Sequence, residues 1–209
     1  MVICLFFAYD IIMKKKLILA SSSPRRKEIL KQMGLEFEII PSAYDESLDN
    51  FKFSYKKIEN LAYNKAKAVL EEIQSLSYIA KDALIISADT VVVLENQILL
   101  KPESREDAIK MLKSLSGKKH FVVTSICIID AETRKNKLSS STSSVEFKDL
   151  DDSLILDYIE QYKPFDKAGS YGIQELPDGF IASVDGSFEN IVGLCSKALD
   201  KILKEMDLF

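Results

Sequence analysis

Apolar residues recur along this chain with two periods, one typical of strands and one typical of helices. Short apolar runs predict strands at 17–19, 37–40, 83–87 with a continuation to 94, 121–129 and 137–147. Apolar residues at helical spacing predict helices at 24–33, 55–73, 104–116, 153–162 and 196–206. This mixture predicts an α/β architecture with a mixed sheet, in which 121–129 and 137–147 form an antiparallel pair.

The first predicted helix has an unusual charge arrangement at its start. Ser23 is placed to cap the helix, Pro24 suits its first position, and Arg25 and Arg26 follow in the first turn. A helix N-terminus carries about half a positive charge, so two arginines there reduce stability unless an anion neutralises them. The preceding strand makes this a strand-to-helix turn, where phosphate is a common ligand. A solvated helix start with ordinary surface arginines is the alternative interpretation.

Lys65 and Asp89 are charged residues within apolar segments. Lys65 is four residues from both Leu61 and Val69, which puts it on the apolar face of its helix. Its charge there is either paired or turned to a polar cleft, or else the side chain extends past the apolar stripe to solvent. Asp89 interrupts the apolar segment 83–94. It either accepts local hydrogen bonds in an Asx-turn or lies at the mouth of a site.

Two further charged residues could complete such a site. Glu46 lies in an acidic loop and could hold, together with Asp89, a divalent cation that bridges phosphate oxygens. Lys101, just before Pro102, adds a positive charge at a strand end. Carboxylates, lysines, arginines and glycine-rich turns are the residue types that metal-assisted attack on a phosphate requires.

Composition excludes several other classes of protein. The chain has 209 residues, a formal net charge of −4 and 29% charged residues, which argues against a strongly basic nucleic-acid-binding protein. His120 is the only histidine, so a Ser-His-Asp or Cys-His mechanism would depend on it alone. Cys4, Cys127 and Cys195 are too few and too scattered for a disulfide framework or a zinc site, and they fit a reducing cytoplasm. The sequence contains no Walker A or paired-glycine dinucleotide motif.

The first twelve residues are apolar but do not have the features of a targeting segment. They lack a basic start and a small-residue cleavage site, and they are too short to span a bilayer. Met13 is an alternative start, because the lysines after it run directly into the first strand. We therefore predict one catalytic domain over 13–209, a dispensable extension at 1–12, and no membrane association.

Seven segments in a fixed order extend over nearly the whole chain. They are Ala20-Ser-Ser-Ser-Pro-Arg-Arg26, Asp45-Glu46, the helix with Lys65, Ser87-Ala-Asp-Thr-Val-Val92, Lys101-Pro102, Ala168-Gly-Ser-Tyr-Gly-Ile-Gln174 and Gly186-Ser-Phe-Glu-Asn-Ile-Val-Gly-Leu194. This series closely resembles the Maf family of nucleoside triphosphate pyrophosphatases. The resemblance implies an elongated α/β fold like that of inosine triphosphate pyrophosphatase, with a mixed sheet flanked by helices and two lobes around a cleft. It also implies cleavage of a nucleoside triphosphate into monophosphate and pyrophosphate.

The resemblance assigns roles to individual residues. Asp89 would be the general base for a water that attacks the α-phosphorus, and Glu46 and Asp89 would hold Mg²⁺ or Mn²⁺. Thr90 and Gln174 would contact the base or sugar, and Asn190 is also expected to bind substrate. The residues expected to hold the phosphates are Ser21, Ser23, Arg25, Arg26, Lys65 and Lys101.

Gln174 is the residue that indicates the substrate. The segment around it resembles the branch of the family that prefers dTTP and UTP, and its amide can both donate to and accept from a thymine or uracil ring. A 7-methyl-GTP branch usually has a different sequence there. Two residues depart from the family pattern: Glu175 replaces a common glycine, and Cys195 replaces a common proline.

Two alternative functions remain open at this stage. One is the same reaction on 7-methyl-GTP, and the other is a nucleotide-binding regulator of septum formation that acts by occupancy and not by turnover. The resemblance also leads us to expect a cytoplasmic protein, a homodimer, and a nucleoside triphosphate as the ligand, with no nucleic acid as partner.

Overall fold

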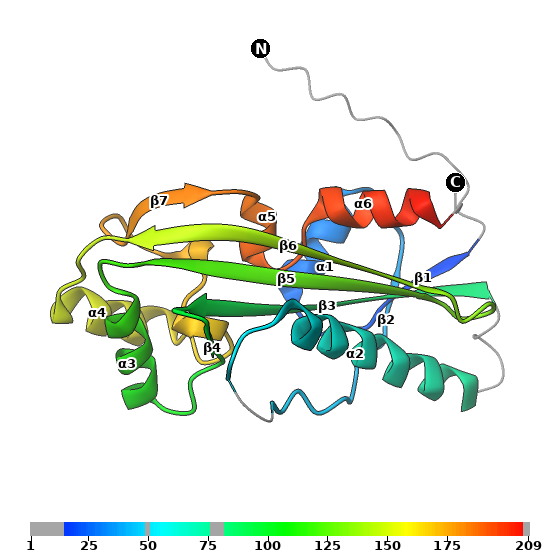
Figure 1. The fold of residues 1–209 in the computed structure, drawn as a ribbon, viewed down its shortest axis with the longest axis horizontal. Helices are drawn as coiled ribbons and strands as arrows, with labels where there is room; N and C mark the ends of the chain where they lie inside the picture. Colours follow the sequence, from blue (N-terminus) through cyan, green and yellow to red (C-terminus); the bar gives the residue numbers. More distant parts are fainter. Residues whose placement is uncertain (1–14, 49–50, 76–81, 207–209) are drawn as a thin grey trace, which may run out of the picture.

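The protein is built around one long mixed sheet, which runs the length of the molecule (Figure 1). The computed structural model describes residues 15–48, 51–75 and 82–206, so the predictions about residues 1–12 and Met13 lie outside it. The strand order is β2-β1-β3-β5-β6-β7, with β4 beside β3. The strands are β1 (Lys16–Leu19), β2 (Glu38–Ile39), β3 (Ala83–Leu94), β4 (Gln97–Leu99), β5 (Lys119–Asp130), β6 (Asn136–Phe147) and β7 (Ile181–Asp185).

Helices cover both faces of this sheet. They are α1 (Pro24–Gln32), α2 (Tyr55–Ser75), α3 (Arg105–Leu115), α4 (Asp152–Tyr162), α5 (Phe188–Val192) and α6 (Ser196–Glu205), and two 3₁₀ turns are η2 (Ala168–Ser170) and η3 (Ile173–Glu175). None of the helices within the described ranges is long and apolar enough to cross a membrane.

The pairing of the strands is parallel at one end of the sheet and antiparallel elsewhere. β1 runs parallel to both β2 and β3, and helices α1 and α2 make the crossovers that parallel neighbours require. β3, β5, β6 and β7 pair antiparallel in that order. The predicted mixed α/β sheet, and the antiparallel pairing of its two long strands, are therefore confirmed.

Successive residues of β3 pack into different layers, because a strand points its side chains alternately to opposite faces. Ile86 and Ala88 pack with α1 and α6, whereas Ala83 and Ile85 pack with α2. Figure 1 shows α1 and α6 on one side of the sheet and α2 on the other. At the far end, α3 and α4 pack around a third cluster that includes Phe147.

One edge of β3 has an interruption in its strand pairing. Leu19 of β1 pairs with Ile86, and the ladder with β4 begins only where Val92 pairs with Leu99. Between these two pairings, residues 87–91 have β5 on one side and, within the described ranges, no strand on the other. Side chains from both faces of β3 can therefore approach the same space at this edge.

Some predictions about local structure need correction. Asp89 is not part of an Asx-turn, because β3 continues through it to Leu94 and Asp89 itself pairs with Ser125 of β5. The glycine-rich region near the C-terminus, for which no regular element was predicted, contains β7 and α5. These elements are short and are separated by glycines, so the sequence around them shows no periodic apolar pattern.

The predicted cap of the first helix is confirmed, since the Ser23 hydroxyl accepts a hydrogen bond from the amide of Arg26 at 3.5 Å.

Candidate active site

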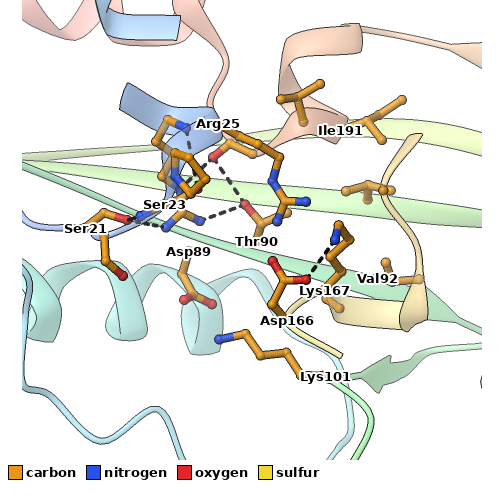
Figure 2. A pocket seen from close by; sticks show the side chains of 18 of the residues that line it. Ser21, Ser23, Arg25, Asp89, Thr90, Val92, Lys101, Asp166, Lys167 and Ile191 are labelled. Atoms are coloured by element: carbon orange, nitrogen blue, oxygen red, sulfur yellow. Dashed lines mark hydrogen bonds and ion pairs between the residues drawn. The ribbon is translucent and has the colours of Figure 1, made fainter. Parts of the chain in front are cut away.

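A pocket lies at the interrupted edge of β3, where the carboxyl end of β1 meets the start of α1. Its wall also includes the residues before and within η2 and η3, and the end of α5 (Figure 2). Of the residues predicted for the site, it brings together Ser21, Ser23, Arg25, Arg26, Glu46, Lys65, Asp89, Thr90, Lys101 and Gln174. Ten predicted residues from six separate segments of the chain therefore line one cavity.

Lys65 links the two acidic residues of the pocket. Its Nζ donates to Oε1 of Glu46 at 2.5 Å and to Oδ1 of Asp89 at 3.2 Å. The Lys65 side chain is 8% exposed, so its charge is paired inside the protein and does not extend to solvent. Lys101 approaches the same group, with its Nζ 3.7 Å from Oε2 of Glu46. Of the alternatives for Lys65, the structure therefore confirms the inward, paired one.

The two carboxyl groups differ in acidity because their surroundings differ. Burial raises the pKa of Asp89 above its ordinary value, and the positive charges of Lys65 and Arg26 offset this only in part. Burial also raises the pKa of Glu46, but Lys65, Lys101 and Arg26 together bring it below its usual range. Two carboxyl groups whose pKa values move apart can take different roles, and Asp89 is the better proton acceptor.

The Arg26 side chain makes three hydrogen bonds to other parts of the protein. Its Nε donates to the carbonyl of Gly193 at 2.9 Å, and its two terminal nitrogens donate to the hydroxyls of Ser21 at 3.2 Å and Thr90 at 3.1 Å. The residue is 8% exposed. Gly193 has a φ of 130°, a backbone conformation that favours glycine. The structure thus gives Arg26 a positioning role between α1 and α5, in which three of its five N–H groups bond to the protein.

Arg25 differs from its neighbour in this respect. Its Nε is buried, yet it has no hydrogen-bond partner among the described residues. Figure 2 shows the Arg25 side chain extending from α1 into the pocket towards Asp166 and Lys167. A buried guanidinium nitrogen without a partner is costly unless a ligand completes it. Of the two arginines at the positively charged start of α1, Arg25 is therefore the one with a guanidinium nitrogen left for an anion.

Asn190 is the one predicted site residue that the structure keeps away from the pocket. It is fully buried in α5, and its Nδ2 donates to the Val122 carbonyl at 2.9 Å and to the Ser143 hydroxyl at 3.0 Å. Its own backbone carbonyl accepts from the Thr124 hydroxyl, which in turn bonds Thr90. Asn190 faces the sheet because α5 packs with that side against β5 and β6, so it anchors α5 and does not line the cavity.

The end of the pocket away from the lysines has apolar walls. Val92 of β3 and Val122 of β5 are paired on adjacent strands and line this end of the pocket, together with Ile191 of α5. Tyr171 and Gln174 lie at this end, and Gln174 is exposed at the rim. A flat ring fits between apolar walls with a few polar groups at its edge, which is the usual composition of small-molecule sites.

Two charged residues of the pocket were missed in the sequence. Asp166 and Lys167 come just before the glycine-rich turn of η2, and both line the cavity. Their position beside the Ala168-Gly169 turn was the available signal, because charged residues next to such turns often contact ligands. Lys167 has 9% of its side chain exposed.

The carboxylates of Glu46 and Asp89 fit a divalent cation. The two groups lie close together in the pocket, because Lys65 Nζ contacts one oxygen of each, Oε1 of Glu46 and Oδ1 of Asp89. Within the described ranges there is no group of three or more His, Cys, Asp or Glu side chains that could hold a metal ion by itself. Two carboxylates suit Mg²⁺ or Mn²⁺, since such ions usually complete their ligands with water and substrate phosphate oxygens.

Comparison with known proteins places the chain among close relatives. Residues 16–206 match the family model described as Maf, Maf-like protein. A protein of Caldicellulosiruptor saccharolyticus named dTTP/UTP pyrophosphatase is 45% identical over 192 residues, which cover 92% of this chain and 95% of that protein. A protein of Ruminiclostridium cellulolyticum with the same name is 41% identical over 194 residues, covering 92% and 97%.

Among solved structures, a HAM1 protein from Coxiella burnetii is similar at 14% identity and a TM-score of 0.49, over 92% of this chain and 98% of that one. The family model spans most of the described residues, and the relatives are similar to the chain over nearly their whole length. The chain belongs to the Maf family.

Proposed function

We propose that this protein is a pyrophosphatase that hydrolyses dTTP and UTP to the monophosphate and pyrophosphate. The relatives named dTTP/UTP pyrophosphatase, at 38–45% identity over most of their length, support the substrates. The observation that carries the reaction is the Glu46–Lys65–Asp89 cluster, which lies in one pocket with the N-terminus of α1. None of these relatives is named for 7-methyl-GTP, which favours dTTP and UTP over that alternative substrate.

In this proposal, Asp89 takes a proton from the attacking water. Its raised pKa makes it a better proton acceptor than an ordinary aspartate, and Lys65 at 3.2 Å stabilises the charged form of the carboxylate. The water oxygen attacks the α-phosphorus, and the bond from that phosphorus to the oxygen bridging to the β-phosphate breaks. The departing group is pyrophosphate, which carries away the electron pair of that bond.

Arg25 and Lys101 hold the triphosphate in this scheme. The unpartnered Nε of Arg25 supports a contact to a phosphate oxygen, and Lys101 has 59% of its side chain exposed at the pocket. The N-terminus of α1 adds its backbone amides and its dipole, with Ser21 and Ser23 in the turn. Arg26 contributes by fixing that turn against Gly193.

Glu46 and Asp89 would hold the divalent cation. When bound, Mg²⁺ or Mn²⁺ would neutralise phosphate charge and polarise the scissile bond. Lys65 keeps the two carboxylates together in the structure, because it contacts both.

The apolar end of the pocket supports binding of the base. The ring would lie between Val92 and Ile191, and the Gln174 amide would face its polar edge. The cytoplasmic location and the homodimer stay predictions from the sequence.

The direct test is to identify the products from dTTP. We expect dTMP and pyrophosphate, separated by anion-exchange chromatography, with Mg²⁺ and Mn²⁺ each added to metal-depleted protein. Orthophosphate together with dTDP would show a different bond to be cleaved. Binding of dTTP without turnover in either metal would favour the regulatory alternative.

A further inference from the structure

The pocket contains an ion pair that the proposed chemistry does not use. Lys167 Nζ lies 3.2 Å from Oε2 of Glu175 in η3, and it donates a hydrogen bond to Asp166 at 2.8 Å. All three residues line the cavity.

The backbone around Gly172 holds the pair in place. A Cβ on Gly172 would come 2.9 Å from Cε of Lys167 and 3.1 Å from Oε2 of Glu175, so both side chains pack directly against this glycine. The Gly172 amide donates to the hydroxyl of Tyr158 at 3.1 Å, and Tyr158 is 1% exposed. The ammonium and the carboxylate are therefore fixed on a well-packed wall.

Both members of the pair can still bind a ligand. Glu175 Oε2 is buried, and within the described ranges no donor makes a well-aligned hydrogen bond to it, although Lys167 lies within ion-pair distance. An ammonium has three N–H donors, and the hydrogen bond that the structure shows for Lys167 Nζ, to Asp166, uses one of them. A neighbouring donor and acceptor are what a hydroxyl group needs, because it accepts and donates at once.

The pair lies between the two halves of the pocket. Arg25 extends towards Asp166 in Figure 2, which puts this end of the cluster beside the phosphate-binding half. Glu175 follows Gln174 directly in η3, at the apolar half. In the view of Figure 2, Lys167 lies between Arg25 and Lys101 on one side and Val92 and Ile191 on the other.

The covalent order of a nucleotide assigns this middle position to the sugar. We propose that Lys167 and Glu175 form the sugar subsite, in which Lys167 Nζ donates a hydrogen bond to the 3′-oxygen and Glu175 accepts one from the 3′-hydroxyl. Both dTTP and UTP carry this hydroxyl, whereas only UTP has the 2′-hydroxyl, so one subsite serves both. The inference rests on the proposed function, because it takes a nucleoside triphosphate as the ligand.

The test compares dTTP with 2′,3′-dideoxythymidine triphosphate, which lacks only the 3′-hydroxyl. The wild-type protein should have a kcat/KM about tenfold lower for the dideoxy compound. Glu175→Ala, and Lys167→Met, which keeps the apolar stem against Gly172, should each raise KM for dTTP about tenfold with little change in kcat. Neither variant should change KM for the dideoxy compound appreciably. Asp178→Asn is the control, because Asp178 is exposed nearby and outside the pocket lining.

The possible outcomes separate this inference from the proposed function. If the wild-type protein converts dTTP to dTMP but uses both compounds equally well, the sugar subsite is wrong and the function stands. Equal losses for the two compounds in either variant would also overturn it, since a structural or phosphate-binding role would produce them. A wild-type protein that hydrolyses neither compound would overturn the proposed function and this inference together.

Discussion

The Nε of Arg26 donates a hydrogen bond to the carbonyl oxygen of Gly193 at 2.9 Å, and this bond ties the first turn of α1 to the end of α5. The two residues are 167 positions apart in the sequence. Arg25, the next residue along the same helix, has no such partner among the described residues for its Nε. Adjacent arginines of one motif are thus placed for different tasks.

The first prediction contrasts these two arginines. Arg26→Ala should lower the free energy of unfolding by about 2–4 kcal/mol, because it removes three hydrogen bonds, to the Gly193 carbonyl and to the hydroxyls of Ser21 and Thr90. Arg25→Ala should change stability by less than about 0.5 kcal/mol while it lowers kcat/KM for dTTP by about ten- to a hundredfold. Denaturant unfolding and steady-state kinetics measure both, and each variant is the control for the other. A large stability loss for Arg25→Ala would show that Arg25 is structural.

The second prediction concerns Asp89. Asp89→Asn keeps the shape of the side chain but removes the base, so turnover should fall by about two orders of magnitude or more with the fold intact. Asp82→Asn, an exposed change just before β3, should leave turnover unchanged. Near-normal turnover in Asp89→Asn would remove this residue from the mechanism. If the variant lost hydrolysis but kept a full regulatory effect in cells, nucleotide binding would be the function.

The acidity of Asp89 also predicts the pH dependence of the reaction. The base must be deprotonated, so kcat/KM should rise with pH through the pKa of Asp89, which burial places above the ordinary aspartate value. Glu46, with its lowered pKa, should stay ionised throughout that range. A pH profile of kcat/KM should therefore show an acidic limb at higher pH than a solvated aspartate gives. The same limb in the residual activity of Asp89→Asn would assign it to another group.

The third prediction concerns recognition of the base. Gln174→Ala should reduce kcat/KM for dTTP and UTP by about ten- to a hundredfold, because base groups that bonded the amide become unpaired. The kcat/KM for a poorly recognised purine triphosphate should fall much less, so the ratio of kcat/KM between pyrimidine and purine substrates should decrease. Parallel assays on dTTP, UTP and ATP measure this. Equal losses on all three would assign Gln174 to phosphate positioning or folding.

The fourth prediction concerns stability in acid. His120 is fully buried, its Nε2 lies 2.8 Å from the Tyr171 hydroxyl, and burial lowers its pKa to about 4. The unfolded chain takes up this proton near the ordinary pKa, so stability is fully present above that value and is lost as the pH falls towards 4. The loss due to this group should be on the order of 3 kcal/mol between pH 6.5 and pH 4.

Urea unfolding at several pH values, compared with His120→Gln, isolates the contribution of this histidine. The variant has no imidazole to protonate, so its stability should fall less steeply over that range, although it should be less stable at neutral pH. An equally steep fall in the variant would assign the acid sensitivity to other groups.

The predictable part of the site was the part that periodicity and local chemistry control. The inward position of Lys65 followed from its spacing to Leu61 and Val69, and the cap at Ser23 from the residues next to it. The partners of Lys65 could not follow in the same way, because Glu46 and Asp89 come from other elements.

The remaining features depend on contacts between distant parts of the chain. The residues next to Arg25 and Arg26 do not show which of them is held in place. Arg26 is held by a hydrogen bond to the carbonyl of Gly193, which is distant in the sequence. Asn190 stands in a motif beside the pocket, but the packing of α5 turns its side chain to the sheet. The glycines that punctuate residues 168–193 likewise conceal β7 and α5, which form only against β6 and β5.

The pocket at the interrupted edge of β3 exists because β1 ends at Leu19. Asp89 and Thr90 are consecutive, so their side chains leave opposite faces of the sheet, and one ligand can touch both only around a strand edge that is open. If β1 continued beyond Leu19 along β3, its backbone would fill that opening without altering any charged residue. An insertion in residues 20–23 that lengthened β1 along β3 should therefore close the pocket even with every charged residue in place.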